Sequence, residues 1–398
     1  MQIIETTDAF KALIEDIKKT EGYRDPLAFG IARVDLGQLN VEKSLQATYP
    51  VVNWDENFGS AAIFVQALAE QGVKVNFTQS EVVCNINAEF LKNCLNAFTP
   101  YADEAHGDAH KNIQVISALY NQIMQSGSLE GEFKVTFIFD DAPLKSVEAT
   151  YLKLYAISLA KVPLRSIVLD GAFGALPNVA WSNGQPIELD YLREFEIELK
   201  LSGEYPHIDF IDKFPRLLQH IIPADNTRIL DTSKVRFGAQ LAGGTTVMPG
   251  ASYINFNAGT TGSVMVEGRI SSSAIVGAGS DVGGGTSILG VLSGTDGNPI
   301  SVGQNCLLGA NSVCGIPLGD GCIIDAGVSI LEGTKIAIYP EELKKLMDVN
   351  TNMNMVGEIF KGKQLAGFYG IHYRQNSMTG EITASRSTRE IKLNADLH

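Results

Sequence analysis

The sequence predicts three parts: a mixed α/β N-terminal domain over residues 1–230, a left-handed parallel β-helix over 235–336, and a small C-terminal segment of helix and strand over 337–398. Two observations carry this prediction. Glycine is concentrated in the middle part, which holds 22 of the 39 glycines, and aliphatic residues recur there at a fixed spacing. No aromatic residue occurs between Phe256 and Tyr339, which suits a narrow interior.

The spacing in the middle part is six residues. A period of six fits neither an α-helix nor a strand that alternates every second residue. It is typical of a parallel β-helix, in which each six-residue unit forms one flat side of a coil. The aliphatic side chain is expected to point inward, with small residues at the corners. The predicted inward positions are Val264, Ile270, Val276, Val282 and Ile288, then Ile300, Cys306, Ser312, Leu318, Ile324, Ile330 and Ile336, and, one step out of phase upstream, Val235, Leu241, Val247 and Tyr253.

The flanks have different patterns. An apolar stripe from Phe10 to Ile17 follows the cap candidates Thr7 and Asp8 and predicts the first helix. The polar, turn-rich stretch 290–299 predicts a loop that leaves the coil. Further helices are expected over 59–72, 88–97, 111–126, about 145–160 and 339–347, with strands over 133–139 and 166–169 and within 358–393, where 376–380 form a hairpin turn.

The composition excludes several classes of partner. The net charge of −14 disfavours nucleic acid and anionic membranes, because both would be repelled. No apolar run reaches the roughly 18 residues of a membrane-spanning helix, and no secretory signal is visible in the first residues. Five cysteines with no CxxC pair predict reduced thiols in a cytoplasmic protein, and Cys306, Cys314 and Cys322 are interpreted as small apolar residues of the coil.

The middle part contains no histidine. The histidine base of many hexapeptide acetyltransferases, or the histidine ligands of hexapeptide carbonic anhydrases, therefore cannot come from it. If an amine is acylated here, a carboxylate must help to remove its proton, or the substrate must arrive deprotonated. The acidic residues available in this part are Glu267, Asp281, Asp296, Asp320, Asp325 and Glu332.

Several sequence blocks are more specific than the repeat. They are RFGAQLAGGTTVMPG, NFNAGT, MVEGRISS, GSDVGGGTSILG, LLGANS, GIPLGDGC and EGTK, followed by YRQNSMTG and LNADLH. In these blocks the chain resembles the longer form of the tetrahydrodipicolinate N-succinyltransferases, from residue 235 to the C-terminus. The resemblance implies a homotrimer with active sites between neighbouring subunits. It implies transfer of succinyl from succinyl-CoA, a co-substrate, to the amine of tetrahydrodipicolinate in its open 2-amino-6-oxopimelate form, in diaminopimelate and lysine synthesis, with no permanently bound cofactor.

The same resemblance implies the site residues. The family's catalytic carboxylate falls on Glu267, in MVEGR. Small residues would let a thin thioester arm approach backbone N–H groups, which bind a developing oxyanion. Arg269 offers a bidentate partner for a carboxylate, and Lys361 and Arg374 supply positive charge for the phosphates of CoA. The implied acyl-CoA contacts are Arg269, Gly284, Ser287, Ala310, Asp325, Ala326, Gly333, Lys361, Arg374, Gln375, Asn376 and Ser377.

Two departures from the family pattern matter. Asp325 stands where relatives often have Glu. Some relatives hold a divalent metal at the trimer axis, but the corresponding positions here are Ser233 and Gly250/Ala251, so no metal is predicted. The alternatives are a different acyl donor such as acetyl-CoA, a non-catalytic trimeric scaffold, and, less favoured because no early Gly-rich nucleotide loop is present, a sugar nucleotidyltransferase. Whether Glu267 acts as a base or forms an acyl-anhydride is left open by the sequence.

Overall fold

The computed structural model describes residues 1–104, 110–291, 297–388 and 393. The predicted loop at 290–299 and the LNADLH block therefore fall partly outside the described residues. Two compact units are present: one comprises 1–156 and 167–215, the other 157–166 and 216–398.

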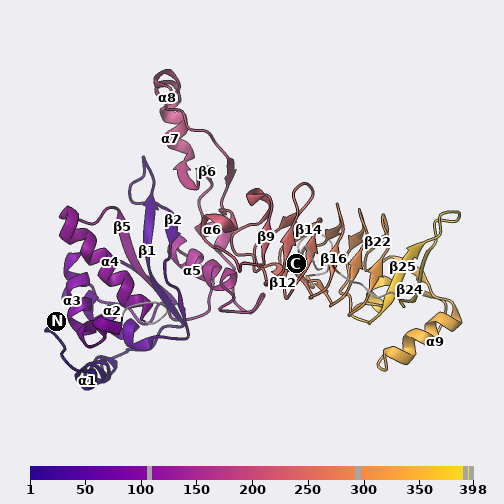
Figure 1. The fold of residues 1–398 in the computed structure, drawn as a ribbon, viewed down its shortest axis with the longest axis horizontal. Coiled ribbons are helices and arrows are strands. Elements are labelled where there is room, and N and C mark those ends of the chain that lie inside the picture. Colours follow the sequence, from indigo (N-terminus) through magenta and orange to yellow (C-terminus); the bar gives the residue numbers. More distant parts are fainter. Residues whose placement is uncertain (105–109, 292–296, 389–392, 394–398) are drawn as a thin grey trace. The chain divides into compact units, whose positions relative to one another are not determined.

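The first unit is built on a five-stranded antiparallel sheet of order β2-β1-β5-β4, with β3 paired to β1. Four helices pack against this sheet through one apolar core, which includes Phe29, Phe64, Phe90 and Phe137. Figure 1 shows these helices beside the sheet. The elements are α1 (Thr7–Lys18), β1 (Ala28–Leu36), β2 (Ser44–Thr48), β3 (Asn53–Trp54), α2 (Phe58–Glu70), β4 (Glu81–Asn85), α3 (Ala88–Phe98), α4 (Lys111–Ser126), β5 (Glu132–Ile138) and α5 (Val147–Ser158).

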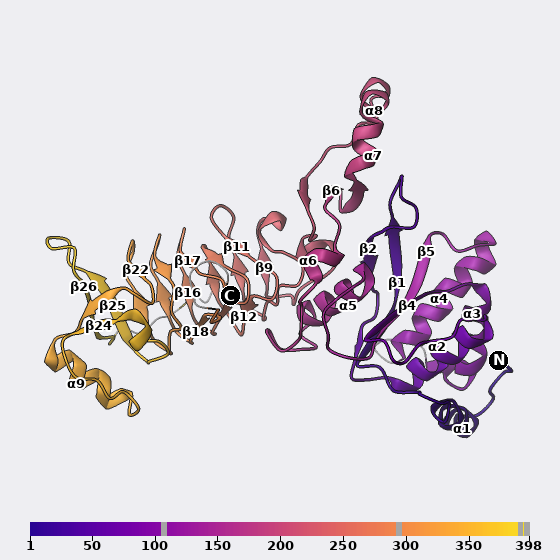
Figure 2. The same ribbon diagram turned by 180° about the vertical axis from the view of Figure 1, so that it is seen from behind.

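The rest of the first unit is a small second sheet with short helices. Its strand order is β7-β6-β8, and the indole of Trp181 is fully buried on it. Figure 2 shows α7 and α8 extending away from the sheets of this unit. The elements are α6 (Ala172–Ala175), β6 (Val179–Ser182), β7 (Gln185–Glu188), α7 (Leu189–Glu194), α8 (Glu196–Ser202) and β8 (Phe210–Asp212).

The predicted helices of this unit are confirmed, with small shifts at their ends. The cap candidates Thr7 and Asp8 were wrong, because the first helix is capped by Thr6, whose hydroxyl accepts from the Ala9 backbone N–H at 3.1 Å. The predicted strand at 166–169 is wrong. Side chains satisfy its backbone groups instead, because Asp141 accepts from the Val168 N–H and the Lys153 ammonium donates to the Val168 carbonyl at 2.7 Å.

The second unit is a β-helix of parallel coils, in agreement with the six-residue repeat (Figure 1). Short strands stack into three sheets, one for each side of the coil. The first side holds β9 (Arg228–Ile229), β10 (Thr246–Val247), β13 (Met265–Val266), β16 (Asp281–Val282), β19 (Leu307–Leu308) and β21 (Ile323–Ile324). The second holds β11 (Tyr253–Ile254), β14 (Arg269–Ile270), β17 (Ser287–Ile288), β20 (Val313–Cys314) and β22 (Ser329–Ile330), and the third holds β12 (Gly259–Thr260), β15 (Ile275–Val276) and β18 (Ser301–Val302).

Most predicted inward positions are buried, and the thiols of Cys306, Cys314 and Cys322 are packed inside as predicted. Burial raises the pKa of Cys314 to about 12, so this thiol stays protonated. The prediction for Tyr253 is wrong, because its neighbour Ile254 is the fully buried residue of that strand.

Two sides of the coil are shorter than the six-residue spacing of the sequence predicts. Only two residues separate β13 from β14, whereas four separate β16 from β17 one coil later. A second short side runs from Cys314 to Leu318, which pairs with Val302 of the previous coil. The six-residue phase is therefore interrupted at both short sides.

The C-terminal segment completes the last coil. The strands β25 (Ile371–Gln375) and β26 (Ile382–Arg386) form the predicted hairpin, and β25 pairs in parallel with β21. Tyr373 continues the inward column after Ile324 and is fully buried. At the other end of the coils, Phe237 is fully buried against the ring of His220. The remaining elements are β23 (Lys335–Ala337), α9 (Pro340–Val349) and β24 (Ile359–Lys361).

The boundary between the units differs from the predicted break after residue 230. The segment 157–166 belongs with the coils, because Gln240 donates to the carbonyls of Ile157 and Val162 and Arg165 donates to Ser301. Residues 216–230 also join the coil unit, as does the whole C-terminal segment.

Candidate active site on the coil surface

A tight corner presents the carboxylate of Glu267. The short connection between β13 and β14 consists of Glu267 and Gly268 alone. A side chain at Gly268 has no room, since its Cβ would lie 2.6 Å from the carbonyl oxygen of Thr286 on the next coil. Glu267 itself is half-buried, and a Cβ at Gly284 would lie 3.6 Å from its Oε2. The structure thus brings Glu267 and Gly284, two predicted site residues, directly together.

Arg269 and Ser287 form a second predicted pair. They are register partners on β14 and β17, so their side chains leave the same face of the sheet on adjacent coils. The Arg269 guanidinium donates to the Ser287 hydroxyl from Nη2 at 2.6 Å and from Nε at 3.2 Å. The side chain of Arg269 is exposed, so the hydroxyl holds one side of the guanidinium and leaves Nη1 accessible to a ligand.

Small residues repeat at the same corner of the following coils. The Gly285 N–H donates to the Glu267 carbonyl, and the Asn311 N–H donates to the Gly284 carbonyl at 2.9 Å. The Gly327 N–H repeats the pattern with the Ala310 carbonyl at 2.9 Å, next to the exposed Ala326. A strip of backbone with hardly any side chain therefore runs along the coils from Glu267 toward the C-terminal end.

Asp325 and Arg374 meet at the end of this strip. The Arg374 Nε lies 3.5 Å from Asp325 Oδ2, and the His372 Nε2 lies 2.7 Å from Asp325 Oδ1. His372 is a residue that the sequence reasoning missed, since histidine was considered only within 235–336. The signal was available: a strand-forming segment downstream of the repeats can extend a side of the coil and bring its own side chains.

The remaining predicted residues lie in the same C-terminal region of the unit. Asn376 Oδ1 accepts from the Met378 N–H at 2.9 Å, and Gln375 Nε2 donates to the Gly380 carbonyl at 3.1 Å, so both side chains support the hairpin turn that exposes Ser377. Lys361 lies on β24 directly across from Lys335 of β23, near Gly333. Lys335 is a second basic residue that the sequence reasoning did not include.

The predicted residues thus form two groups along the coils. From β13 to β25 the sheet advances by four strands, through β16, β19 and β21. At about 4.8 Å per strand this separates Glu267 from Arg374 by roughly 19 Å along the coil axis. The small residues lie between the two groups, so the arrangement suits one extended ligand better than two separate small ones.

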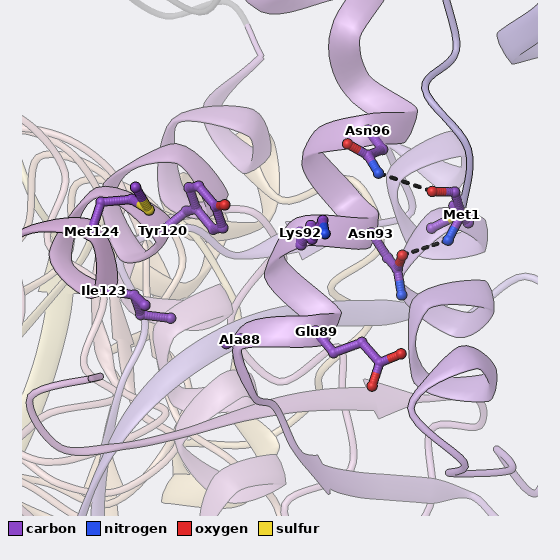
Figure 3. Close-up of a pocket in the computed structure, with 9 residues that line it drawn as sticks. All are labelled: Met1, Ala88, Glu89, Lys92, Asn93, Asn96, Tyr120, Ile123 and Met124. Carbon is purple, nitrogen blue, oxygen red and sulfur yellow. Dashed lines mark hydrogen bonds between the residues drawn. The ribbon is translucent and has the colours of Figure 1, made fainter. Parts of the chain in front are cut away.

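A cavity in the first unit is separate from these two groups of predicted site residues. A cavity of about 530 Å³ lies between α3 and α4 in the first unit (Figure 3), beside Asn93, Asn96 and Tyr120, and none of the predicted site residues lines it. Within the described residues no cluster of three or more His, Cys, Asp or Glu side chains is placed to hold a metal ion, and the predicted lack of a metal stays a prediction. In the same part of the chain, no helix is long and apolar enough to cross a membrane.

Comparison with known proteins covers the whole chain. The family models for the N-terminal and middle domains of tetrahydrodipicolinate N-succinyltransferase match residues 8–174 and 176–216, and the hexapeptide repeat of succinyl-transferase matches 299–332. The 2,3,4,5-tetrahydropyridine-2,6-dicarboxylate N-succinyltransferase of Sulfurimonas denitrificans is 75% identical over 100% of both chains. The Helicobacter pylori protein of the same name is 50% identical, over 98% of this chain and 99% of its own.

The chain belongs to the tetrahydrodipicolinate N-succinyltransferase family.

The family extends over both units. A crystal structure of a 2,3,4,5-tetrahydropyridine-2-carboxylate N-succinyltransferase from Campylobacter jejuni superposes with a TM-score of 0.92 at 54% identity, and covers 98% of this chain and all of its own. The sequence blocks had tied only the coils and the C-terminal segment to the family. The matches at 8–216 add the first unit, whose α and β elements are thus a family feature and not an unrelated fusion.

Proposed function

We propose that this chain is a succinyl-CoA-dependent N-acyltransferase that succinylates the amine of tetrahydrodipicolinate, in its open 2-amino-6-oxopimelate form, on the route to diaminopimelate and lysine. Full-length identity of 75% to a protein named for this reaction carries the proposal. Succinyl-CoA is a co-substrate, and no cofactor is permanently bound. The placement of Glu267 beside Gly284, and of Arg269 beside Ser287, supports the choice of site.

The donor lies along the strip of small residues. Its thioester is at Glu267, and its phosphates are at the C-terminal group that includes Arg374 and Lys361. Gly284, Ala310 and Ala326 leave backbone free to contact the pantetheine arm, and an N–H group there stabilises the oxyanion of the tetrahedral intermediate. Gly333 and Ser377, with Gln375 and Asn376 behind the turn, complete the predicted donor contacts.

The reaction needs one proton removed. The acceptor amine attacks the thioester carbonyl, the C–S bond breaks, and the CoA thiolate leaves with the electron pair of that bond. In the first route Glu267 accepts the proton of the amine as a general base. In the second route the Glu267 carboxylate attacks the thioester, the C–S bond breaks and the CoA thiolate leaves. The amine then attacks the resulting acyl-anhydride, the Glu267 carboxylate is released, and the thiolate takes the proton of the amine. Arg269 binds a carboxylate of the succinyl group or of the acceptor.

The active assembly is proposed to be a cytoplasmic homotrimer of left-handed coils, with each site completed by a neighbouring subunit and without metal, membrane or nucleic-acid partners. The flat sides of the coils are the surfaces that such packing covers. A homotrimer also explains how an exposed side chain such as Arg269 enters a cleft.

The test is CoA release from succinyl-CoA in the presence and absence of the acceptor, with mass spectrometry of the product. Acceptor-dependent release and an N-succinyl product are expected. If acetyl-CoA were used at an equal rate, acetyl-CoA would be favoured as the alternative donor. If neither thioester released CoA, the remaining interpretation would be a non-catalytic trimeric scaffold.

A further inference from the structure

Three polar groups converge at the end of the coils, and one of them, His372, is not among the residues that the family resemblance pointed to. His372 enters on β25, where its register partner on β21 is Ile323. Its Nε2 lies 2.7 Å from Asp325 Oδ1 and 3.2 Å from the Nε of Arg374. The His372 side chain is only 12% exposed, whereas those of Asp325 and Arg374 are 44% and 59% exposed. The imidazole is thus the packed member of the group, and the two charged groups face solvent.

The distances decide where the proton lies. An unprotonated Nε2 would place its lone pair 2.7 Å from a carboxylate oxygen, which is repulsive, so Nε2 must carry the hydrogen and donate to Asp325. The Nε of Arg374 lies 3.2 Å from the same nitrogen and 3.5 Å from Asp325 Oδ2, with which the guanidinium forms an ion pair. Asp325 therefore contacts His372 through Oδ1 and pairs with the charged guanidinium of Arg374 through Oδ2.

This arrangement leaves the outer edge of the guanidinium available. Among the described residues only the Nε of Arg374 contacts the group, so the N–H donors on Nη1 and Nη2 are free for a ligand. A guanidinium held by Nε and open at its two Nη atoms is suited to bidentate recognition of phosphate. We propose that His372 is a positioning residue. By hydrogen-bonding to one oxygen of Asp325, it prevents that carboxylate from binding both the Nε and the Nη groups of Arg374. The guanidinium thereby stays directed at a phosphate of the acyl-CoA donor.

The inference rests on the proposed function, because it assigns a role within the donor site. It gives His372 no part in the chemical step. Four strand-to-strand steps separate β13 from β25, or roughly 19 Å, whereas a general base must reach its proton directly or through one water. Loss of His372 should therefore change donor binding and leave turnover almost unaltered.

The experiment compares His372→Leu, which cannot donate, with His372→Gln, whose amide N–H can still reach Asp325. His207→Leu is the matched control, because His207 also lies beside an aspartate, Asp209, at 3.9 Å, but in the first unit. CoA affinity is measured by calorimetry, and turnover is measured with succinyl-CoA and with S-succinyl-pantetheine, the same thioester without phosphates. Trimer mass is checked for each variant.

For His372→Leu we expect CoA to bind about tenfold more weakly or worse, kcat to stay within about twofold, and the constants with succinyl-pantetheine to be unchanged. His372→Gln should recover most of the affinity. In an Arg374→Gln background, His372→Leu should have no further effect on CoA binding, because the group it positions is absent.

The proposal is overturned if His372→Leu binds CoA like the wild type, if it impairs the phosphate-free donor equally, or if its effect persists fully without Arg374. Should His372→Leu fail to assemble, the cycle is run with His372→Gln and Asp325→Asn. A wild-type protein that binds CoA but transfers no succinyl would refute the proposed function alone; one that does not bind CoA would refute the positioning role.

Discussion

The guanidinium of Arg269 hydrogen-bonds to the hydroxyl of Ser287 across two adjacent coils, at 2.6 Å from Nη2. The contact fixes a positive charge two residues from Glu267. We expect Arg269→Ala to raise the KM for a dicarboxylate substrate or to lower kcat, because a charge-assisted hydrogen bond worth about 1.5–3 kcal/mol is lost. Steady-state kinetics for both substrates measure this, with Arg193→Ala, an exposed arginine of the first unit, as control. Unchanged constants would remove Arg269 from the site.

Glu267→Gln should lower kcat by about 10²–10⁴-fold, because the amide keeps the size of the side chain and loses its basicity. Trimer mass and CoA affinity should stay near the wild type, as should all constants of Glu341→Gln, an exposed acid on α9. A variant that retains more than about a tenth of kcat would show that proton removal is not the task of Glu267. Hydroxylamine trapping after mixing with succinyl-CoA alone separates the routes, since only an acyl-anhydride modifies Glu267.

Gly284 and Gly285 are neighbours in the sequence, but their surroundings differ. We therefore expect an alanine substitution to have different effects at the two positions. At Gly284 a Cβ would meet only Glu267 Oε2, at 3.6 Å, so Gly284→Ala should fold normally and reduce activity by crowding the thioester. At Gly285 the φ of +74° and a Cβ only 2.2 Å from Asn311 Oδ1 oppose any side chain. Gly285→Ala should therefore lower stability by about 1–2 kcal/mol or more. Denaturation midpoints and kcat/KM for both variants test the pair, and equal midpoints would contradict it.

The stability should fall in acid partly through His220. Burial lowers the pKa of this imidazole to about 3, whereas an unfolded histidine titrates near 6.5. Between these pH values the His220 imidazole is protonated in the unfolded chain and neutral in the folded chain. The free energy of unfolding therefore decreases as the pH falls from about 6.5 toward 3. His220→Phe, which keeps a ring against Phe237, should flatten the dependence of the urea midpoint on pH in this window. An unaltered slope at fixed protein concentration would count against it.

The protein should be a homotrimer in solution, because the sides of the coils need covering. Mass photometry at micromolar concentration should give three times the chain mass of 42.9 kDa. A stable monomer would contradict both the assembly and a site shared between subunits.

The repeat region was predictable because burial inside a coil constrains every sixth residue. Val282 and Ile288 could be assigned from spacing alone, and both are fully buried. Spacing could not show that Glu267 and Gly268 form a shortened corner, since Val264 falls on the six-residue grid even though Val266 is the strand residue. The corner depends on contact with Thr286 of the next coil, which no local pattern contains.

The sequence reasoning was weaker wherever partners are distant along the chain. His372 reaches Asp325 only because β25 pairs with β21, 47 residues upstream. The false strand at 166–169 has the same origin, because Asp141 and Lys153 satisfy the backbone of Val168 in place of a neighbouring strand. Local composition resembled a strand, and the side chains that overrode it lie on other elements.

The buried rings of Phe237 and Tyr373 have a consequence for the length of the stack. A parallel β-helix is a template at each end, because its last coil offers unpaired backbone to any further coil. Here an aromatic ring lies fully buried near each end, and the antiparallel partner β26 occupies the edge of β25. At the C-terminal end, coils from another molecule therefore find neither a matching aliphatic layer nor a free edge on β25. An antiparallel strand at this position opposes end-to-end stacking of coils at the C-terminal end, the hazard of open repeat arrays.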